Sequence, residues 1–314
     1  MGGGSMSSKV ATIARSRNKG SLLKELWEDK DKYLMITPFF VFYFIFTIAP
    51  IVIALLLSFT DFNMIDIPNF VWFENYQKLF LEDSIFLITV KNTLLFALIT
   101  GPISYFLCLI MAWLINELPP VPRAFLTFLF YAPSIAGNLY VIWSLIFSGD
   151  MYGWANGLLM DLGLIYEPIQ WLTDPQYNLT IIIVVQLWMS FGAGFLSFIA
   201  GLQGVDRSLY EAAALDGIRN RWQEFLYVTI PSMGPQLMFG AVMQISSSFS
   251  AGRICIALAG NPSTDYSAST VITHLIDYGT YRYEMGYACS IATVLFIAML
   301  LCNNLIKKVL NKYV

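Results

Sequence analysis

The chain has 314 residues, of which 57% are hydrophobic and only 12% are charged, and its formal net charge is −3. This small number of charged side chains cannot cover a water-soluble globule of this length. The composition therefore excludes a soluble domain and indicates a membrane protein. The net charge of −3 says nothing about nucleic acid, and no nucleic-acid partner is expected.

Residues 1–32 form a polar segment that precedes the first apolar stretch, and we predict that it lies in the cytoplasm. Met1 to Ser5 is read as an artificial leader outside the fold. Leu22, Leu23, Leu26 and Trp27 share one face of a helical wheel, with charged residues around the rest. This pattern predicts an amphipathic helix on the inner membrane surface, in contact with lipid.

Six stretches of at least 22 residues contain no Asp, Glu, Lys or Arg. They are residues 33–60, 92–116, 124–149, 175–205, 225–252 and 285–306. A helix of about 20 residues crosses the hydrocarbon core of a bilayer, so each stretch is long enough to span it. The sequence therefore predicts an all-α integral membrane protein, with six transmembrane helices in a domain covering residues 33–306.

The basic residues indicate the orientation of these helices. An even number of spans places both termini on one side of the membrane, and residues 307–314 form a basic tail there. If that side is the cytoplasm, 14 of the 18 Lys and Arg residues lie inside, and only Lys78, Lys91, Arg253 and Arg282 lie outside. Cytoplasmic segments carry an excess of Lys and Arg, so we predict an N-in, C-in topology.

Residues 203–231, between the fourth and fifth spans, form the most informative polar segment. Ser208 and Glu211 have the spacing of a capping box, which predicts a helix through the alanines that follow. Gly217 then supplies a left-handed residue that ends this helix, and a second helix leads to Pro231. This segment is either a helix–turn–helix that projects toward a partner or an ordinary connecting loop.

Residues 210–217, Tyr-Glu-Ala-Ala-Ala-Leu-Asp-Gly, followed by Val-Thr-Ile-Pro at 228–231, resemble the EAA loop of permease subunits in bacterial ABC importers. Ten residues separate Gly217 from Val228, where the usual spacing is nine, which puts the pitch of the second helix in doubt. Shorter landmarks are similar to the sugar-importer branch, in particular the maltose-type F subunit. They are Phe-Glu-Asn-Tyr at 73–76, Lys-Asn-Thr-Leu at 91–94, Gly-Asp-Met-Tyr-Gly at 149–153, Trp-Leu-Thr-Asp-Pro at 171–175 and Gly-Leu-Gln at 201–203.

The resemblance implies a type I ABC importer permease fold in the bacterial cytoplasmic membrane. It also implies four kinds of partner: a second homologous permease, an ATP-binding cassette ATPase dimer, an extracellular solute-binding protein and a sugar. By the same resemblance, Glu211, Ala212, Ala213 and Gly217 make the contact with the ATPase. No Gly-x-x-x-x-Gly-Lys-Ser/Thr phosphate loop occurs in the sequence, so the chain is expected to be no enzyme and to hold no cofactor, with ATP bound by its partner.

Neutral polar residues near the middle of two spans are the candidate sugar-binding residues. Gln186 and Ser190 lie four residues apart on the fourth span, and Gln244, Ser247 and Ser248 share one face of the fifth. Polar groups at this depth either face a cavity or hydrogen-bond between helices. We expect no charge in this zone and place Arg253 at its outer rim, which argues against phosphate, a metal ion or an amino acid as the substrate.

Three rival functions remain open at this stage. An ion-gradient-driven secondary transporter usually buries an ionisable relay, and the predicted spans show none. An ABC permease for another neutral polar solute would use the same residue types. An intramembrane enzyme would need a nucleophile with its base or a metal cluster, whereas the chain has four cysteines without Cys-x-x-Cys spacing and a single histidine, His274.

Overall fold

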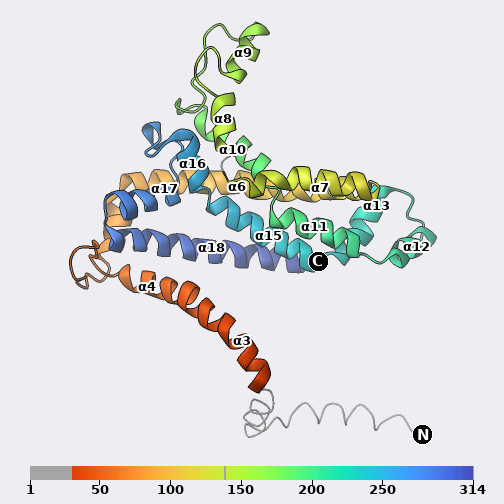
Figure 1. Ribbon diagram of the computed structural model, residues 1–314, viewed down its shortest axis with the longest axis horizontal. Helices are drawn as coiled ribbons and strands as arrows, with labels where there is room; N and C mark the ends of the chain where they lie inside the picture. The colour runs from red at the N-terminus through yellow and green to blue at the C-terminus, as the bar shows by residue number, and fades with distance from the viewer. Residues whose placement is uncertain (1–29, 138, 314) are drawn as a thin grey trace. The chain divides into compact units, whose positions relative to one another are not determined.

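The computed structural model describes residues 30–137 and 139–313, and the chain divides into two compact units, Met1–Leu56 and Leu57–Val314. Apart from one isolated antiparallel bridge between Thr60 and Phe70, the described residues form helices, turns and loops (Figure 1). The predicted all-α class is confirmed. The amphipathic helix expected within residues 1–32 lies almost wholly outside the described residues.

In the first unit, α3 (Lys30–Tyr43) continues through a π-helical turn (Phe44–Ile48) into α4 (Ala49–Leu57). None of the residues in these three elements is buried. Phe39, Phe42 and Phe46 are among the large apolar side chains that remain exposed. Such a surface fits a helix whose neighbours are lipid tails or another protein chain.

The second unit contains the remaining elements in chain order. They are α5 (Glu74–Gln77), a π-turn (Lys78–Glu82), α6 (Ser84–Asn116), α7 (Pro120–Ile135), α8 (Tyr140–Ile146), α9 (Trp154–Asp161), α10 (Asn178–Met189), α11 (Ala193–Gly204), α12 (Arg207–Leu215), α13 (Arg221–Glu224), a π-turn (Phe225–Thr229), α14 (Ile230–Ser232), α15 (Gly234–Phe249), α16 (Gly252–Ala259), a 3-10 turn (Thr264–Tyr266), α17 (Val271–Ile276), a π-turn (Asp277–Tyr281) and α18 (Met285–Tyr313).

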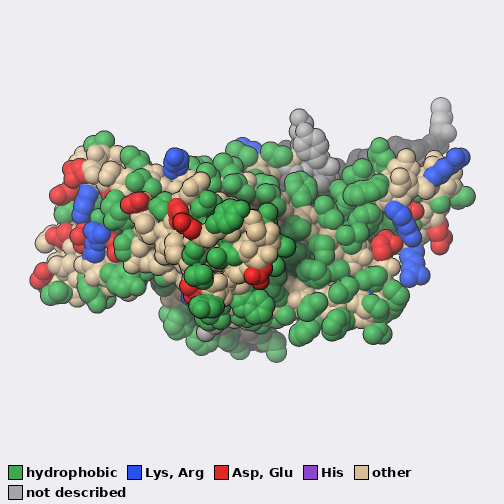
Figure 2. Space-filling model, turned by 90° about the horizontal axis from the view of Figure 1, so that it is seen from above, with side chains coloured by type: hydrophobic (Ala, Val, Ile, Leu, Met, Phe, Trp, Pro, Cys, Tyr) green, Lys and Arg blue, Asp and Glu red, His purple; other side chains and the backbone are tan. Residues whose placement is uncertain are grey.

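Four helices of the described residues are long and apolar enough to cross a membrane, and the number of spans is up to six. Four are Lys30–Leu57, Ser84–Asn116, Asn178–Gly204 and Met285–Val309, and two more spans are counted if α7 with α8 and α15 with α16 each make one. On the face shown in Figure 2, Lys and Arg gather toward the two ends, and hydrophobic side chains cover most of the surface between them. The N-in, C-in orientation stays a prediction.

Three of the predicted spans are interrupted rather than continuous. The fourth breaks between α10 and α11, where Gly192 adopts an extended backbone with φ −102° and ψ −144°. The fifth begins at Gly234 instead of residue 225, and α16 continues it at an angle of 41° to α15. In the third, α7 and α8 lie 90° apart. Broken helices of this kind leave backbone groups free at membrane depth, which is tolerated where they line a cavity or are buried in protein.

The centre of the second unit is a three-helix core in which α6, α11 and α15 pack against one another. Its buried apolar side chains include Leu109, Phe195, Phe198 and Leu237. Helices α11 and α15 approach closely because Gly194 faces Gly240: a Cβ added to Gly194 would lie only 3.4 Å from the Gly240 Cα. Small residues at such a crossing let two backbones meet without side chains between them.

An arm made of α8, α9 and the loop to α10 stands away from the packed helices (Figure 1). Within this arm, the side chain of Asn156 on α9 is fully buried. Its amide nitrogen donates to the carbonyl oxygens of Ser148, Asp150 and Ile169, and its oxygen accepts from the Trp171 indole at 2.8 Å. One side chain thus joins the segment before α9 to the segment after it.

A buried polar cluster joins three elements at the predicted outer end. The Asp83 carboxylate caps α6 by accepting from the Phe86 N–H, and it also contacts His274 Nε2 and the Tyr287 hydroxyl, each at 2.8 Å. The side chains of His274 and Asp83 are only 4% and 7% exposed. Burial raises the pKa of Asp83, but the hydrogen bonds from Phe86, Tyr287 and His274 together hold it below its ordinary value.

Asp83→Asn should lower the free energy of unfolding of the purified protein at pH 7 by about 1–2 kcal/mol, and so lower its melting temperature, because the charge-assisted hydrogen bonds are lost. A carboxylate whose pKa is depressed on folding stabilises the fold above its unfolded pKa of about 3.9, and this contribution disappears as the pH falls through the folded value. The difference in melting temperature between wild type and variant should therefore shrink below about pH 4.

Asp161→Asn, at an exposed position on α9, is the matched control and should follow the wild-type pH profile. A constant difference between Asp83→Asn and wild type from pH 7 to pH 3 would show that the charge of Asp83 contributes nothing.

Candidate functional site

The predicted cytoplasmic projection is present as α12, the turn after it, and α13. The Asp206 carboxylate begins α12 by accepting from the Ser208 N–H at 3.0 Å, and this bond lowers the pKa of Asp206. The predicted capping box of Ser208 and Glu211 is therefore wrong, because Ser208 is already inside the first turn of the helix. Sequence spacing alone could not choose between Asp206 and Ser208, two residues apart, because both residue types are good helix caps.

Gly217 ends α12 as predicted, in the left-handed region with φ 92°. The Ile218 N–H donates to the Ala213 carbonyl oxygen at 3.1 Å, and the Gly217 N–H donates to that of Ala214 at 3.3 Å. This pair of bonds is a Schellman motif. The motif places residue 217 in the left-handed region, which favours glycine because glycine has no Cβ.

The residues expected to contact the ATPase do not all face outward. Glu211, Ala212 and Gly217 are exposed, whereas Ala213 is only 7% exposed and packs inward. A direct contact through Ala213 is therefore not available in this structure. Leu215, which the sequence reading did not select, is 90% exposed at the end of α12. An exposed leucine on a projecting helix is a candidate for burial by a partner.

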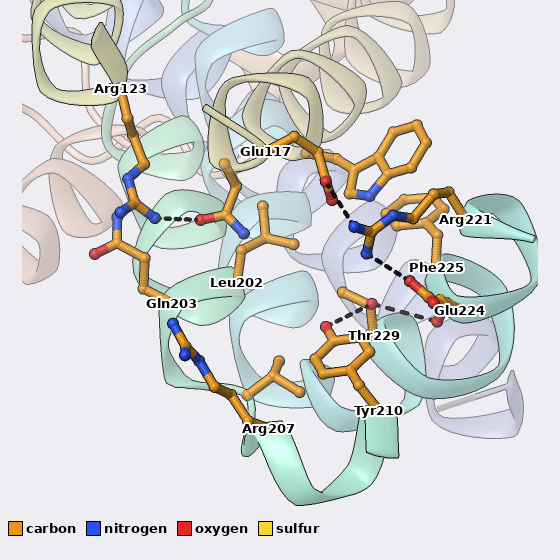
Figure 3. A pocket seen from close by; sticks show the side chains of 13 residues that line it. Glu117, Arg123, Leu202, Gln203, Arg207, Tyr210, Arg221, Glu224, Phe225 and Thr229 are labelled. Atoms are coloured by element: carbon orange, nitrogen blue, oxygen red, sulfur yellow. Dashed lines mark hydrogen bonds and ion pairs between the residues drawn. The ribbon is translucent and has the colours of Figure 1, made fainter. Parts of the chain in front are cut away.

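A polar cavity of about 390 Å³ lies where α12 and α13 meet the ends of α6 and α11 (Figure 3). On one side, the Arg221 guanidinium lies between Glu224, at 2.8 Å, and Glu117, at 3.6 Å. The hydroxyls of Tyr210 and Thr229, 2.9 Å apart, join α12 to the π-turn after α13. The Arg221–Glu117 contact connects the projection to the residue that follows α6.

The candidate sugar-binding residues divide into two groups. Gln186, Ser190, Gln244 and Ser247 border one cavity of about 330 Å³ at the two helix breaks. Ser248 lies on a different side of α15, where it borders an apolar cavity and accepts from the Thr100 hydroxyl at 3.0 Å. Gln244 borders both cavities, and the assignment of Ser248 to the sugar path stays a prediction.

Gln244 is 4% exposed and is the centre of a buried network between helices. Its Oε1 accepts from the Ser104 hydroxyl of α6 at 3.1 Å, and its Nε2 donates to the Ser190 carbonyl oxygen at 3.1 Å. The Ser190 carbonyl belongs to the break after α10, where it also accepts from the Gly192 N–H at 2.8 Å. These bonds join α15 to α6 and to the end of α10, and contact of Gln244 with a sugar stays a prediction.

Gln244→Leu should destabilise the purified protein by about 1–2 kcal/mol, because it leaves the Ser190 carbonyl oxygen without this donor. Gln186→Leu is the matched control: Gln186 is half-buried and makes one side-chain bond, to Ser247 at 3.2 Å. We expect the control to keep the wild-type melting temperature in detergent and to lose substrate affinity instead. Equal destabilisation by the two substitutions would contradict the distinction.

The same cavity carries a charge that the sequence reading did not expect. Arg253, predicted to lie at the outer rim, is exposed and borders the cavity together with Gln186 and Ser247. Arg253 lies in the first turn of α16, directly after the 41° bend between α15 and α16, and the residues of this bend border the cavity. The expectation of an uncharged substrate zone is therefore corrected.

Comparison with known proteins gives the class. No known family profile matches the chain. The lactose transport system permease protein LacF of Rhizobium radiobacter is 30% identical over 74% of this chain and 75% of its own length. The sulfoquinovosyl glycerol transport system permease protein SmoG of Agrobacterium fabrum is 31% identical over 74% of each chain.

Among solved structures, a bacterial ABC transporter that imports the acidic polysaccharide alginate has a chain of the same fold, with a TM-score of 0.73. It is 24% identical to this chain, over 92% of this chain and 99% of its own. The fold and these relatives define a membrane-spanning subunit of a transporter. The chain belongs to the family of ABC sugar transport system permease proteins.

Proposed function

We propose that this chain is half of the translocation path of an ATP-driven, binding-protein-dependent sugar importer in the bacterial cytoplasmic membrane. The observation that carries the proposal is the cavity at the two helix breaks, where Gln186 and Ser247 present a neutral amide and a hydroxyl in a permease of this family. Such groups pair with sugar hydroxyls, which are donors and acceptors alike.

The proposed partners follow from the same family. A second, homologous permease completes the path, an ATPase dimer binds α12 on the cytoplasmic side, and an extracellular solute-binding protein delivers the sugar. The chain itself contributes no ATP-binding site to this scheme, and it needs no cofactor of its own.

The arrangement of elements suggests how the ATPase acts on the cavity. Helix α11 runs from the break at Gly192 to Gly204, and α12 begins at Arg207 directly after it. A displacement of α12 by the ATPase is therefore transmitted along α11 to the break that borders the cavity. In this scheme the two nucleotide states of the ATPase favour two arrangements of the permease pair, one open to each side.

Reconstitution tests this function against the ion-gradient alternative. The chain is co-expressed with a second permease, an ATPase and a binding protein from its host, and uptake of radiolabelled oligosaccharides into proteoliposomes is measured. We expect uptake to require ATP on the ATPase side and to be indifferent to imposed proton or sodium gradients. Uptake that follows an ion gradient without ATP would overturn the proposal, and ATP-driven uptake of a non-sugar solute alone would replace the substrate class.

A further inference from the structure

Arg253 is the cation of the proposed sugar cavity. It lies in the first turn of α16, and its exposed side chain borders the cavity that also contains Gln186 and Ser247. The cavity's volume of about 330 Å³ lies within the usual range for a small-molecule site. The position of Arg253 makes it a neighbour of any ligand held by these two residues.

The charge of Arg253 is unbalanced within the part of the chain that the structure describes. No Asp or Glu borders the cavity, and Arg253 forms no ion pair with any described carboxylate. By contrast, Arg221 and Arg282 each have a carboxylate oxygen at 2.8 Å. An exposed guanidinium that borders a cavity without a carboxylate partner is available to an anionic group of a ligand.

The backbone beside Arg253 adds to the positive potential of the cavity. Gly192, Ala193 and Gly194, at the start of α11, also border it, and no side chain caps this helix. The free N–H groups and dipole of a helix N-terminus favour negative charge. Arg253 and the start of α11 approach the same space from two different helices.

We propose that the transported substrate is an acidic saccharide that carries a carboxylate, such as a uronic-acid oligosaccharide, and that Arg253 binds this carboxylate. This inference rests on the proposed sugar-import function and specifies its substrate class. The guanidinium is a planar fork of donors that matches a carboxylate in a bidentate pair. Gln186 and Ser247 bind the neutral hydroxyls, which every saccharide shares, so Arg253 supplies the discrimination.

The test measures occupancy of the cavity without the binding protein, whose own selectivity would otherwise mask the result. Ser247→Cys is introduced into the assembled transporter, with Cys289 and Cys302 replaced by serine, and is labelled with a small water-soluble thiol reagent. Protection from labelling is titrated with a uronic-acid oligosaccharide and with the neutral oligosaccharide of equal length and linkage. Uptake with ATP and the binding protein is measured in parallel.

We expect the acidic sugar to protect at about 10–100-fold lower concentration than the neutral one, as one charged hydrogen-bonded pair allows. Arg253→Gln should raise the protective concentration of the acidic sugar to that of the neutral sugar, whereas Arg253→Lys should retain part of the preference. Lys91→Gln, which removes an exposed cation that does not border the cavity, should change neither value.

Equal protection by both sugars in the wild type would overturn the proposal. So would an equal loss for both sugars in Arg253→Gln, or dissociation of the two permeases in that variant, because Arg253 would then bind the second permease. In these cases ATP-driven uptake of the neutral sugar would persist and the proposed function would stand. Absence of ATP-driven uptake for every sugar would instead reject the proposed function.

Discussion

Leu215→Asp and Glu211→Lys should each release the ATPase from the membrane complex and abolish ATP-driven uptake. Leu215 is 90% exposed at the end of α12, and burial of a leucine by a partner contributes about 1.5–3 kcal/mol. An aspartate there both removes this contribution and places a charge in an apolar contact, so association should weaken by about 100-fold or more. Glu211→Lys reverses an exposed charge on the same helix.

The measurement is the amount of ATPase that co-purifies with the tagged permease, followed by uptake in proteoliposomes. Lys307→Glu is the control, since Lys307 is exposed near the end of α18 and lies on the same predicted side of the membrane. Thermal stability of the permease should be unchanged in all three variants, because none of the three side chains is buried. Wild-type stoichiometry of the ATPase in both α12 variants would show that this helix is not its docking surface.

The membrane helices could be predicted from the sequence because their signal is local. A run of about 20 residues without charge is sufficient to identify a span, and each of the six runs coincides with a long helix or a bent pair. Gly217 was also predictable, since the end of a helix depends on the few residues that form its last turn. Both features are decided by neighbours in the chain, and so the linear pattern contains them.

The features that the sequence did not show depend on residues far apart in the chain. Asp83 meets His274 and Tyr287 across about 200 positions, and no spacing rule predicts that contact. A helix break that introduces no charged residue does not change the hydropathy of a span. For this reason the sequence did not predict the interruption at Gly192. That break and the bend after α15 decide which polar side chains reach the cavity.

The surroundings of Ser248 and Arg253 show the same limit. Ser247 and Ser248 both lie within α15, before its bend, and Ser248 accepts from the Thr100 hydroxyl of α6, which is 148 positions away in the chain. Arg253, expected at the outer rim, borders the cavity with Gln186 and Ser247. The local residue types were read correctly, but contacts between distant segments set their environment.

Gly240→Leu should prevent the second unit from folding into its native packing. A Cβ at position 240 would overlap the Phe198 ring of α11. If α15 moved away to relieve this overlap, it would lose the close contact with α11 that Gly194 and Gly240 allow. Phe198 is fully buried, so its ring has no alternative space. Overpacking of this kind costs about 3 kcal/mol, and we expect most of the variant to aggregate or be degraded.

Size-exclusion chromatography in mild detergent measures the fraction of monodisperse protein. Gly204→Leu is the control, because a Cβ at position 204 meets nothing within 4 Å, and this variant should purify like the wild type. Phe198→Ala in the Gly240→Leu background should restore part of the monodisperse fraction, since the smaller side chain vacates the space that leucine needs. If Gly240→Leu alone purifies normally, or if Phe198→Ala gives no recovery, α11 and α15 do not cross at these residues.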